Sequence, residues 1–127
     1  MADQFLKGLR VLLLEDEFLI ALDVEQICYD EGCAEVQTFR DLSEVNDAVL
    51  NANSFDLAIV DVMMGEGMTL PLADKLRSRG VPFVFSTGLS RTEDTFRDFS
   101  DVPVVTKPYA SHQLTAAMQA ALSTRRS

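Results

Sequence analysis

Short apolar runs alternate with amphipathic segments along the chain, in a repeating order of strand and helix. The apolar runs predict strands over residues 9–14, 33–39, 55–60, 81–85 and 102–106. Apolar residues at helical spacing predict helices over residues 17–31, 42–52, 71–79 and 111–122. A fifth such segment, 91–99, is mostly polar, with only Phe96 and Phe99 to anchor it, so any helix there is weakly held.

Residues with known effects on helix ends support these boundaries. Gly32 follows the first helix, where glycine commonly ends a helix. Asp41 and Glu44 have the spacing of a capping box, which predicts the start of the second helix. Pro71 suits a first helical turn, and Ser111 is expected to cap the last helix.

Five strands that alternate with five helices predict a parallel α/β sheet with helices on both faces, because parallel neighbours need crossover connections. The pattern alone does not fix the order of the strands. The flavodoxin-like order 2-1-3-4-5 is one of two common choices for this size, and it is the order we expect. The 127 residues contain no internal repeat or linker, so residues 1–127 are expected to form one domain.

The charge balance narrows the possible partners. The chain has 20 acidic and 11 basic residues, a formal net charge of -9. Nucleic acids and anionic membranes are bound by clustered basic residues, so neither is an expected partner. A metal cation or a protein with a basic face suits this charge better.

The remaining composition indicates a protein of the cytoplasm. Cys28 and Cys33 match no common zinc pattern, and His112 is the only histidine, so both cysteines are interpreted as small buried residues in a reducing compartment. No apolar stretch approaches the roughly 20 residues of a membrane span. The acidic N-terminus does not resemble a signal peptide.

Polar residues with complementary chemistry stand where four predicted strands end. They are the acidic run 15–17, Asp61, Thr87 and Lys107. Ligands of open α/β sheets bind at the carboxyl ends of the strands, and in the order 2-1-3-4-5 these four strands are neighbours. A single such residue is usually a turn or cap residue, but four strand ends with matched chemistry are hard to explain in that way.

This combination suits phosphoryl transfer. Clustered carboxylates repel one another unless a cation joins them, and carboxylate oxygens are ligands that Mg²⁺ prefers. Lys107 adds a fixed positive charge, and Thr87 adds a hydroxyl that can bond an incoming oxygen. Asp61 can then act as the nucleophile that forms an aspartyl-phosphate.

The same residues resemble the receiver domain of two-component response regulators, over essentially the whole chain from about Leu9 to Leu122. Each motif is weak alone, but the order and spacing are highly specific. The matching motifs are Glu15-Asp16 after the first strand, Asp61 after the third, Thr87-Gly88 after the fourth and Lys107-Pro108 after the fifth.

The resemblance implies a role for each matched position. Asp16 and Asp61 would ligate Mg²⁺ together with the backbone carbonyl of Met63, and Glu15 would reach the metal directly or through water. Lys107 would pair with the phosphoryl group on Asp61, and Thr87 would hydrogen-bond that group. The Lys107-Pro108 peptide is expected to be cis.

The resemblance also implies the partners and the kind of activity. A histidine kinase or a phosphotransfer protein would donate the phosphoryl group from a phosphohistidine. The chain would be a phosphoacceptor signalling protein rather than an enzyme with a separate substrate, and it would catalyse only its own phosphorylation and dephosphorylation. A downstream protein target would read the phosphorylated state.

Three positions depart from the usual receiver pattern. Gly65 stands in place of a proline, which predicts a more mobile loop, and Glu15 stands where many receivers have Asp. Val104 stands where most receivers have an aromatic switch residue.

Residues 85–89 resemble a subfamily with the motif Phe-Ala-Thr-Gly-hydrophobic-Tyr, although Ser90 replaces the tyrosine. The hypothesis is that activation reorders residues 90–99 instead of flipping an aromatic ring.

Three other classes of protein fit less well. A haloacid-dehalogenase phosphatase needs a second Asp two positions after Asp61, where Met63 cannot transfer a proton. A flavodoxin-type cofactor binder needs a phosphate loop where the acidic run 15–17 would repel phosphate. A non-phosphorylated interaction module would have lost the acid pair, Asp61 or Lys107.

Two forms of a receiver remain open. The chain begins with Met1 and no output domain follows the last helix, which favours a stand-alone regulator that binds a target or shuttles phosphate. The alternative is a receiver domain excised from a hybrid histidine kinase.

Overall fold

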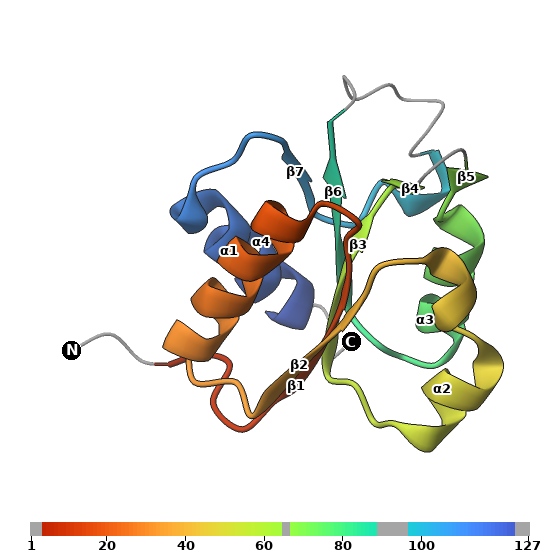
Figure 1. The fold of residues 1–127 in the computed structure, drawn as a ribbon, viewed down its shortest axis with the longest axis horizontal. Helices are drawn as coiled ribbons and strands as arrows, with labels where there is room; N and C mark the ends of the chain where they lie inside the picture. The colour runs from red at the N-terminus through yellow and green to blue at the C-terminus, as the bar shows by residue number, and fades with distance from the viewer. Residues whose placement is uncertain (1–3, 65–66, 89–96, 124–127) are drawn as a thin grey trace.

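The computed structural model describes residues 4–64, 67–88 and 97–123, which form a five-stranded sheet between two layers of helices, with a separate two-stranded hairpin (Figure 1). The elements in chain order are β1 (Arg10–Leu14), α1 (Phe18–Asp30), β2 (Glu35–Phe39), the 3₁₀ turn η1 (Leu42–Glu44), α2 (Asp47–Ala52), β3 (Leu57–Asp61), β4 (Met63–Met64), β5 (Gly67–Met68), α3 (Leu70–Ser78), β6 (Phe83–Thr87), the 3₁₀ turn η2 (Arg97–Phe99), β7 (Val104–Thr106) and α4 (Ser111–Ser123).

The five main strands are all parallel and lie in the order β2-β1-β3-β6-β7. Numbered along the chain as main strands, this is the expected order 2-1-3-4-5, so the predicted α/β fold is confirmed. Every residue of β3 and β6 is buried. Parallel strands covered on both faces are continuously apolar, which is why these strands could be recognised as short apolar runs.

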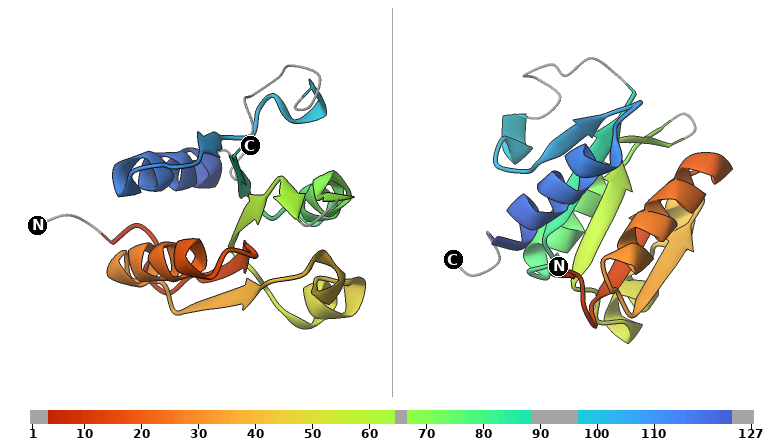
Figure 2. Two further views of the ribbon diagram at one scale, coloured as in Figure 1. Left: turned by 45° about the horizontal axis from the view of Figure 1, so that its top comes forward. Right: turned by 90° about the vertical axis from the view of Figure 1, so that its left-hand side faces the viewer.

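Alternate residues of the strands face two separate cores (Figure 2). On one face, α1 and α4 cover β-strand residues such as Leu13 and Ile59 with Val24 and Met118. On the other face, α2 and α3 cover a second set of strand residues. That set and its partners include Leu12, Leu14, Val60, Phe85, Leu50, Leu72 and Leu76. The period of two along each strand therefore builds both cores from the same sheet.

Both cysteines are buried, Cys28 near the end of α1 and Cys33 just after it. Gly32 has a φ of 90°, a left-handed conformation that glycine adopts without a Cβ clash. The Gly32 amide donates to the Tyr29 carbonyl at 3.0 Å, and the Cys33 amide donates to the Cys28 carbonyl at 3.2 Å. Burial raises the pKa of the Cys28 thiol to about 12, so this pair behaves as apolar packing, as expected.

The predicted helix over residues 42–52 is wrong in one respect, because the structure divides it in two. The capping box of Asp41 and Glu44 is present, but it starts only the 3₁₀ turn η1. Val45 leaves the helical conformation with φ −100° and ψ 74°. Asn46 then starts α2, and its Oδ1 accepts a hydrogen bond from the Val49 amide at 2.9 Å.

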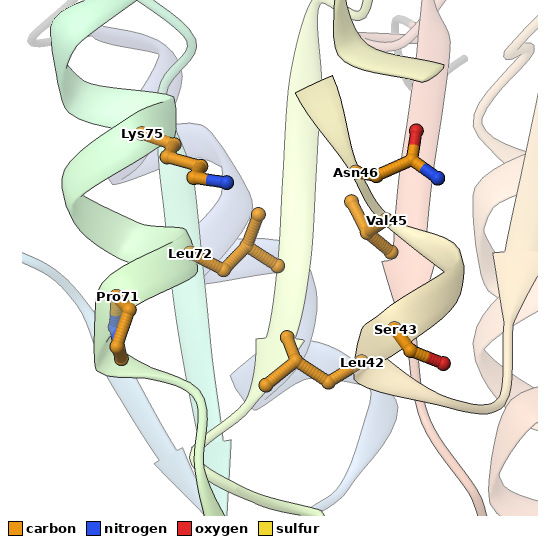
Figure 3. A pocket seen from close by; sticks show the side chains of 7 residues that line it. All are labelled: Leu42, Ser43, Val45, Asn46, Pro71, Leu72 and Lys75. Carbon is orange, nitrogen blue, oxygen red and sulfur yellow. The ribbon is translucent and has the colours of Figure 1, made fainter. Parts of the chain in front are cut away.

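This interruption leaves a groove beside α3. Leu42 and Val45 face Leu72 across it, and Lys75 lies at its margin (Figure 3). The groove has a volume of about 250 Å³. None of its lining residues belongs to the polar strand ends, so it is separate from the predicted site.

One smaller expectation about the C-terminal half also needs correction. Ser111 does not cap the last helix; it is the first residue of α4, and the Ala110 carbonyl accepts from the amides of Gln113 and Leu114. The segment 91–96 lies outside the described residues, while Phe99 is buried against Phe83 and Phe85 as an anchor. Among the described residues, no helix is long and apolar enough to cross a membrane.

Candidate functional site

The sheet brings the predicted polar strand ends to one edge. Glu15 directly follows β1, Asp61 is the last residue of β3, and Thr87 is the last residue of β6. In the ladders, Asp61 is level with Ser86, and Thr87 is level with Thr106. The main-chain amide of Lys107 donates to the Thr87 carbonyl at 2.7 Å, so the last predicted residue is fixed to the same edge.

Lys107 is the centre of this cluster. Its Nζ lies 2.9 Å from Asp61 Oδ2, 3.0 Å from Glu15 Oε1 and 3.0 Å from Glu17 Oε2. An ammonium group has three N–H donors, so each can serve one of these carboxylates. The Lys107 side chain is 13% exposed, Asp61 6% and Glu15 1%, whereas Glu17 is 60% exposed.

The cluster changes the acid–base behaviour of its members. Burial alone would lower the pKa of Lys107, but its hydrogen bonds to Asp61, Glu17 and Glu15 outweigh that effect and raise it. Lys107 therefore stays charged. The pKa of Glu15 is raised by burial and by the charge of Asp61, although the bonds from Lys107 and from the Glu17 amide oppose the rise.

The carboxylates can also hold a metal ion. Each of Glu15, Asp16, Glu17 and Asp61 offers an oxygen, and these oxygens lie within 4.8 Å of one another. Asp16 is exposed, so its carboxylate is open to an ion arriving from solvent. One ammonium cannot neutralise this many acids, and hard oxygen ligands suit Mg²⁺, so the residues fit the ion that the resemblance implies. Met63 lies in β4, two residues beyond Asp61.

The Lys107-Pro108 peptide is cis, as expected. Val104 is half-buried in β7, at the position where an aromatic residue would be usual. Gly65, Ser90 and the rest of the segment 89–96 lie outside the described residues, so the hypothesis that residues 90–99 reorder stays a prediction.

Three residues near the site were not singled out by the sequence. Glu17 was visible as part of the acidic run, but its bond to Lys107 was not. Thr69, eight positions after Asp61, is fully buried, and its hydroxyl donates to the Asp61 carbonyl at 2.6 Å. Burial and the negative charge of Glu15 raise the pKa of the Tyr109 phenol to about 12. The local sequence does not reveal these contacts of Thr69 and Tyr109, because they form only when the chain folds.

Comparisons with known proteins agree with this arrangement. The model of the response regulator receiver domain matches residues 11–119. A transcriptional regulatory protein, PdtaR of Mycobacterium tuberculosis, is 29% identical over 117 residues, which cover 90% of this chain and 57% of that protein. RprY of Bacteroides fragilis, also a transcriptional regulatory protein, is 27% identical, with 90% of this chain and 49% of that protein covered. The chain thus spans about half the length of these curated relatives.

Solved structures show the same fold. The solution structure of SdrG from Sphingomonas melonis Fr1 is 32% identical, with a TM-score of 0.73 and coverage of 91% of this chain and 97% of that one. A response regulator receiver protein from Sinorhizobium medicae superposes with a TM-score of 0.81 at 23% identity, covering 94% and 98% of the two chains. The family match and the strand-end cluster lead to one conclusion: this chain belongs to the response regulator receiver domains of two-component signalling.

Proposed function

We propose that Asp61 accepts a phosphoryl group from the phosphohistidine of a histidine kinase or a phosphotransfer protein. One observation carries the proposal: the Asp61 carboxylate is buried at a strand end, 2.9 Å from the ammonium of Lys107 and among further carboxylates. A carboxylate held in this way is preorganised as a nucleophile, with a cation ready for the charge of the transferred group.

The transfer exchanges one bond to phosphorus for another. An Asp61 oxygen forms a bond to phosphorus as the bond between phosphorus and the histidine nitrogen breaks, and the released imidazole takes a proton from solvent. Lys107 moves its ammonium from the carboxylates toward a phosphoryl oxygen. The Thr87 hydroxyl donates to another phosphoryl oxygen, so that both groups stabilise the charge on the transferred group.

Mg²⁺ would be held by Glu15, Asp16 and Asp61, together with the main-chain carbonyl of Met63. When bound, the ion supplies positive charge that stabilises the phosphoryl oxygens and offsets the repulsion between the acids. The catalysed reactions would be the phosphorylation of the chain itself and the later hydrolysis of its aspartyl-phosphate, and not the turnover of a separate substrate.

An apolar surface beside the site suits the protein that donates the phosphoryl group. Phe18, Leu19, Leu22 and Tyr29 are all exposed, and all lie on α1. Phe18 directly follows Glu17, and α1 starts at the edge of the sheet where the strands end (Figure 1). A partner that packs on α1 would bring its histidine close to Asp61, and apolar contact of this kind gives affinity.

The proposal is tested with acetyl phosphate as a small donor. Incubation with acetyl phosphate and Mg²⁺, followed by intact-mass measurement, should show the gain of one phosphoryl group, and EDTA should prevent the gain. Asp61→Asn should abolish it.

Asp56→Asn is the matched control, because Asp56 directly precedes the same strand and lies at its opposite end. That variant should gain the phosphoryl group as the wild type does. No gain in the wild type would favour a non-phosphorylated interaction module instead. A gain that survives Asp61→Asn would refute Asp61 as the phosphoacceptor.

The downstream step is proposed to be protein binding that depends on phosphorylation, or onward transfer of the phosphoryl group. A pull-down with wild type and Asp61→Ala, each with and without a phosphate mimic, separates the two states. A target captured only by the wild type with the mimic would identify the protein that reads the signal.

A further inference from the structure

Thr69 is a fully buried polar residue between the hairpin β4–β5 and α3. Its hydroxyl lies 2.6 Å from the Asp61 carbonyl oxygen and 3.1 Å from the Val62 carbonyl oxygen. Its amide donates to the same Val62 carbonyl at 2.9 Å. One residue thus binds the main chain of the proposed phosphoacceptor and of the residue that follows it.

The position of Thr69 in the helix makes this use of its hydroxyl unexpected. Thr69 is the N-cap residue of α3, where a threonine hydroxyl normally accepts a hydrogen bond from an amide of its own first turn. No such bond is formed at Thr69. The side chain forgoes a contribution to its helix and is directed to the end of β3 instead.

At the end of β3, the chain has hydrogen bonds to a neighbouring strand on one side only. The ladder between β1 and β3 stops at the pair Leu14 and Val60, one residue before Asp61. On the other side, β6 continues to hold the chain, because the Val62 amide donates to the Ser86 carbonyl at 2.9 Å. The Thr69 hydroxyl reaches Asp61 where the ladder with β1 has ended.

We infer that Thr69 is a positioning residue, which fixes the main chain of Asp61 and the base of the β4–β5 hairpin for Mg²⁺ binding. Met63 pairs with Met68 in that hairpin, and the hydrogen bond from the Thr69 amide to the Val62 carbonyl closes it. The orientation of the Asp61 carboxylate and of the Met63 carbonyl therefore depends on Thr69. This inference rests on the proposed function, because it assigns Mg²⁺ to those two groups.

Groups that orient the ligands of a metal strongly affect its affinity. Loss of such a supporting hydrogen bond typically weakens metal binding by about 10- to 100-fold. Removal of the Thr69 hydroxyl takes a donor from a buried carbonyl and loosens the hairpin, so the expected effect on the Mg²⁺ dissociation constant is an increase of about tenfold or more.

The test compares Thr69→Val, which keeps the shape and removes the hydroxyl, with Thr69→Ser, which keeps the hydroxyl. The readout is the Mg²⁺ dissociation constant from calorimetric titration of the metal-free protein. Thr38→Val is the matched control, since it removes a hydroxyl that bonds Glu25 away from the site. We expect weak binding only in Thr69→Val, with Thr69→Ser and Thr38→Val within about threefold of wild type.

Each outcome decides the matter. Wild-type affinity in a folded Thr69→Val, or equal loss in Thr69→Val and Thr69→Ser, would refute the role of Thr69 while Mg²⁺ binding by the wild type stands. A wild type that binds no Mg²⁺ would refute the metal site itself, and the role of Thr69 with it.

A measurement on the wild type covers the case in which Thr69→Val does not fold. If Mg²⁺ binding depends on the hydrogen bonds of Thr69, saturating Mg²⁺ should slow hydrogen exchange of the Thr69 amide by about tenfold. The reason is that the hairpin could then open only if the metal dissociated. An exchange rate unchanged by Mg²⁺ would contradict the inference.

Discussion

Two basic residues, Arg10 and Lys107, form ion pairs at opposite ends of the sheet. Arg10 begins β1, and its guanidinium contacts Glu35 at 2.9 Å and the Asn53 side chain at 3.0 Å. Lys107 follows β7 and contacts three carboxylates. The Arg10 side chain is 32% exposed and Glu35 50%, so solvent reaches both partners of that pair.

The difference in burial and in the number of acids distinguishes a structural ion pair at Arg10 from a functional site at Lys107. At the amino ends of the strands, the Arg10 guanidinium pairs with the exposed carboxylate of Glu35, and a solvent-screened pair of this kind contributes little to stability. At the carboxyl ends, two buried acids, Glu15 and Asp61, share one cation, and burial together with the charge of Asp61 raises the pKa of Glu15. The excess negative charge costs stability in the metal-free protein, and a metal cation can relieve it.

Replacement of the central cation should give the largest effect. Lys107→Met leaves Glu15 and Asp61 buried without their partner, so we expect a loss of about 3–5 kcal/mol in the free energy of unfolding in EDTA. Arg10→Met should cost about 1 kcal/mol or less. Urea denaturation measures both, and a larger loss in Arg10→Met would reverse the comparison.

Replacement of the phosphoacceptor should act in the opposite direction. Asp61→Asn removes one of the buried charges that repel each other, so we expect the protein in EDTA to be more stable by about 1–2 kcal/mol. The same variant should lose phosphorylation completely. Asp56→Asn at the other end of the strand should bring no gain in stability, and a similar gain there would show that the effect is not specific to the site.

The pH dependence should report on Glu15. Its folded pKa is raised above the ordinary value of 4.5, so the folded state binds a proton more readily than the unfolded state. In EDTA, stability should therefore rise as pH falls through the raised pKa toward 4.5, where the benefit becomes complete. Denaturation at a series of pH values should show this rise in wild type relative to Glu15→Gln, and parallel curves for the two proteins would contradict it.

The smallest effect should come from the exposed acid beside Arg10. Glu35→Gln removes one charge from a pair that solvent already screens, so the free energy of unfolding should change by about 0.5 kcal/mol or less. Its Mg²⁺ affinity should equal that of wild type in titration. A measurable loss of Mg²⁺ binding would mean that the two ends of the sheet are coupled.

Much of the fold and of the candidate site could be predicted because both follow from the strands. Buried parallel strands are continuously apolar, so the run that ends at Asp61 was recognisable together with its end. Residues at strand ends meet at one edge, so the proximity of Asp61, Glu15 and Lys107 followed from the topology.

Other features depend on contacts that no local pattern reveals. Val45 fits a helical stripe, yet it leaves the helix, because Asn46 offers a second cap that competes with the capping box. Thr69 has the sequence position of an ordinary cap, but its hydroxyl bonds to Asp61 instead. In both cases the sequence allowed two hydrogen-bonding arrangements, and tertiary packing determined which of them forms.

The phenol of Tyr109 has an optical consequence. The chain has no tryptophan and two tyrosines, and Tyr29 is exposed, with its hydroxyl accepting from the Val36 amide. The Tyr109 hydroxyl is buried, has no hydrogen-bond partner among the described residues, and senses the charge of Glu15. Its near-ultraviolet absorption and emission should therefore shift when charge at the site changes, which makes the unlabelled protein its own spectroscopic reporter.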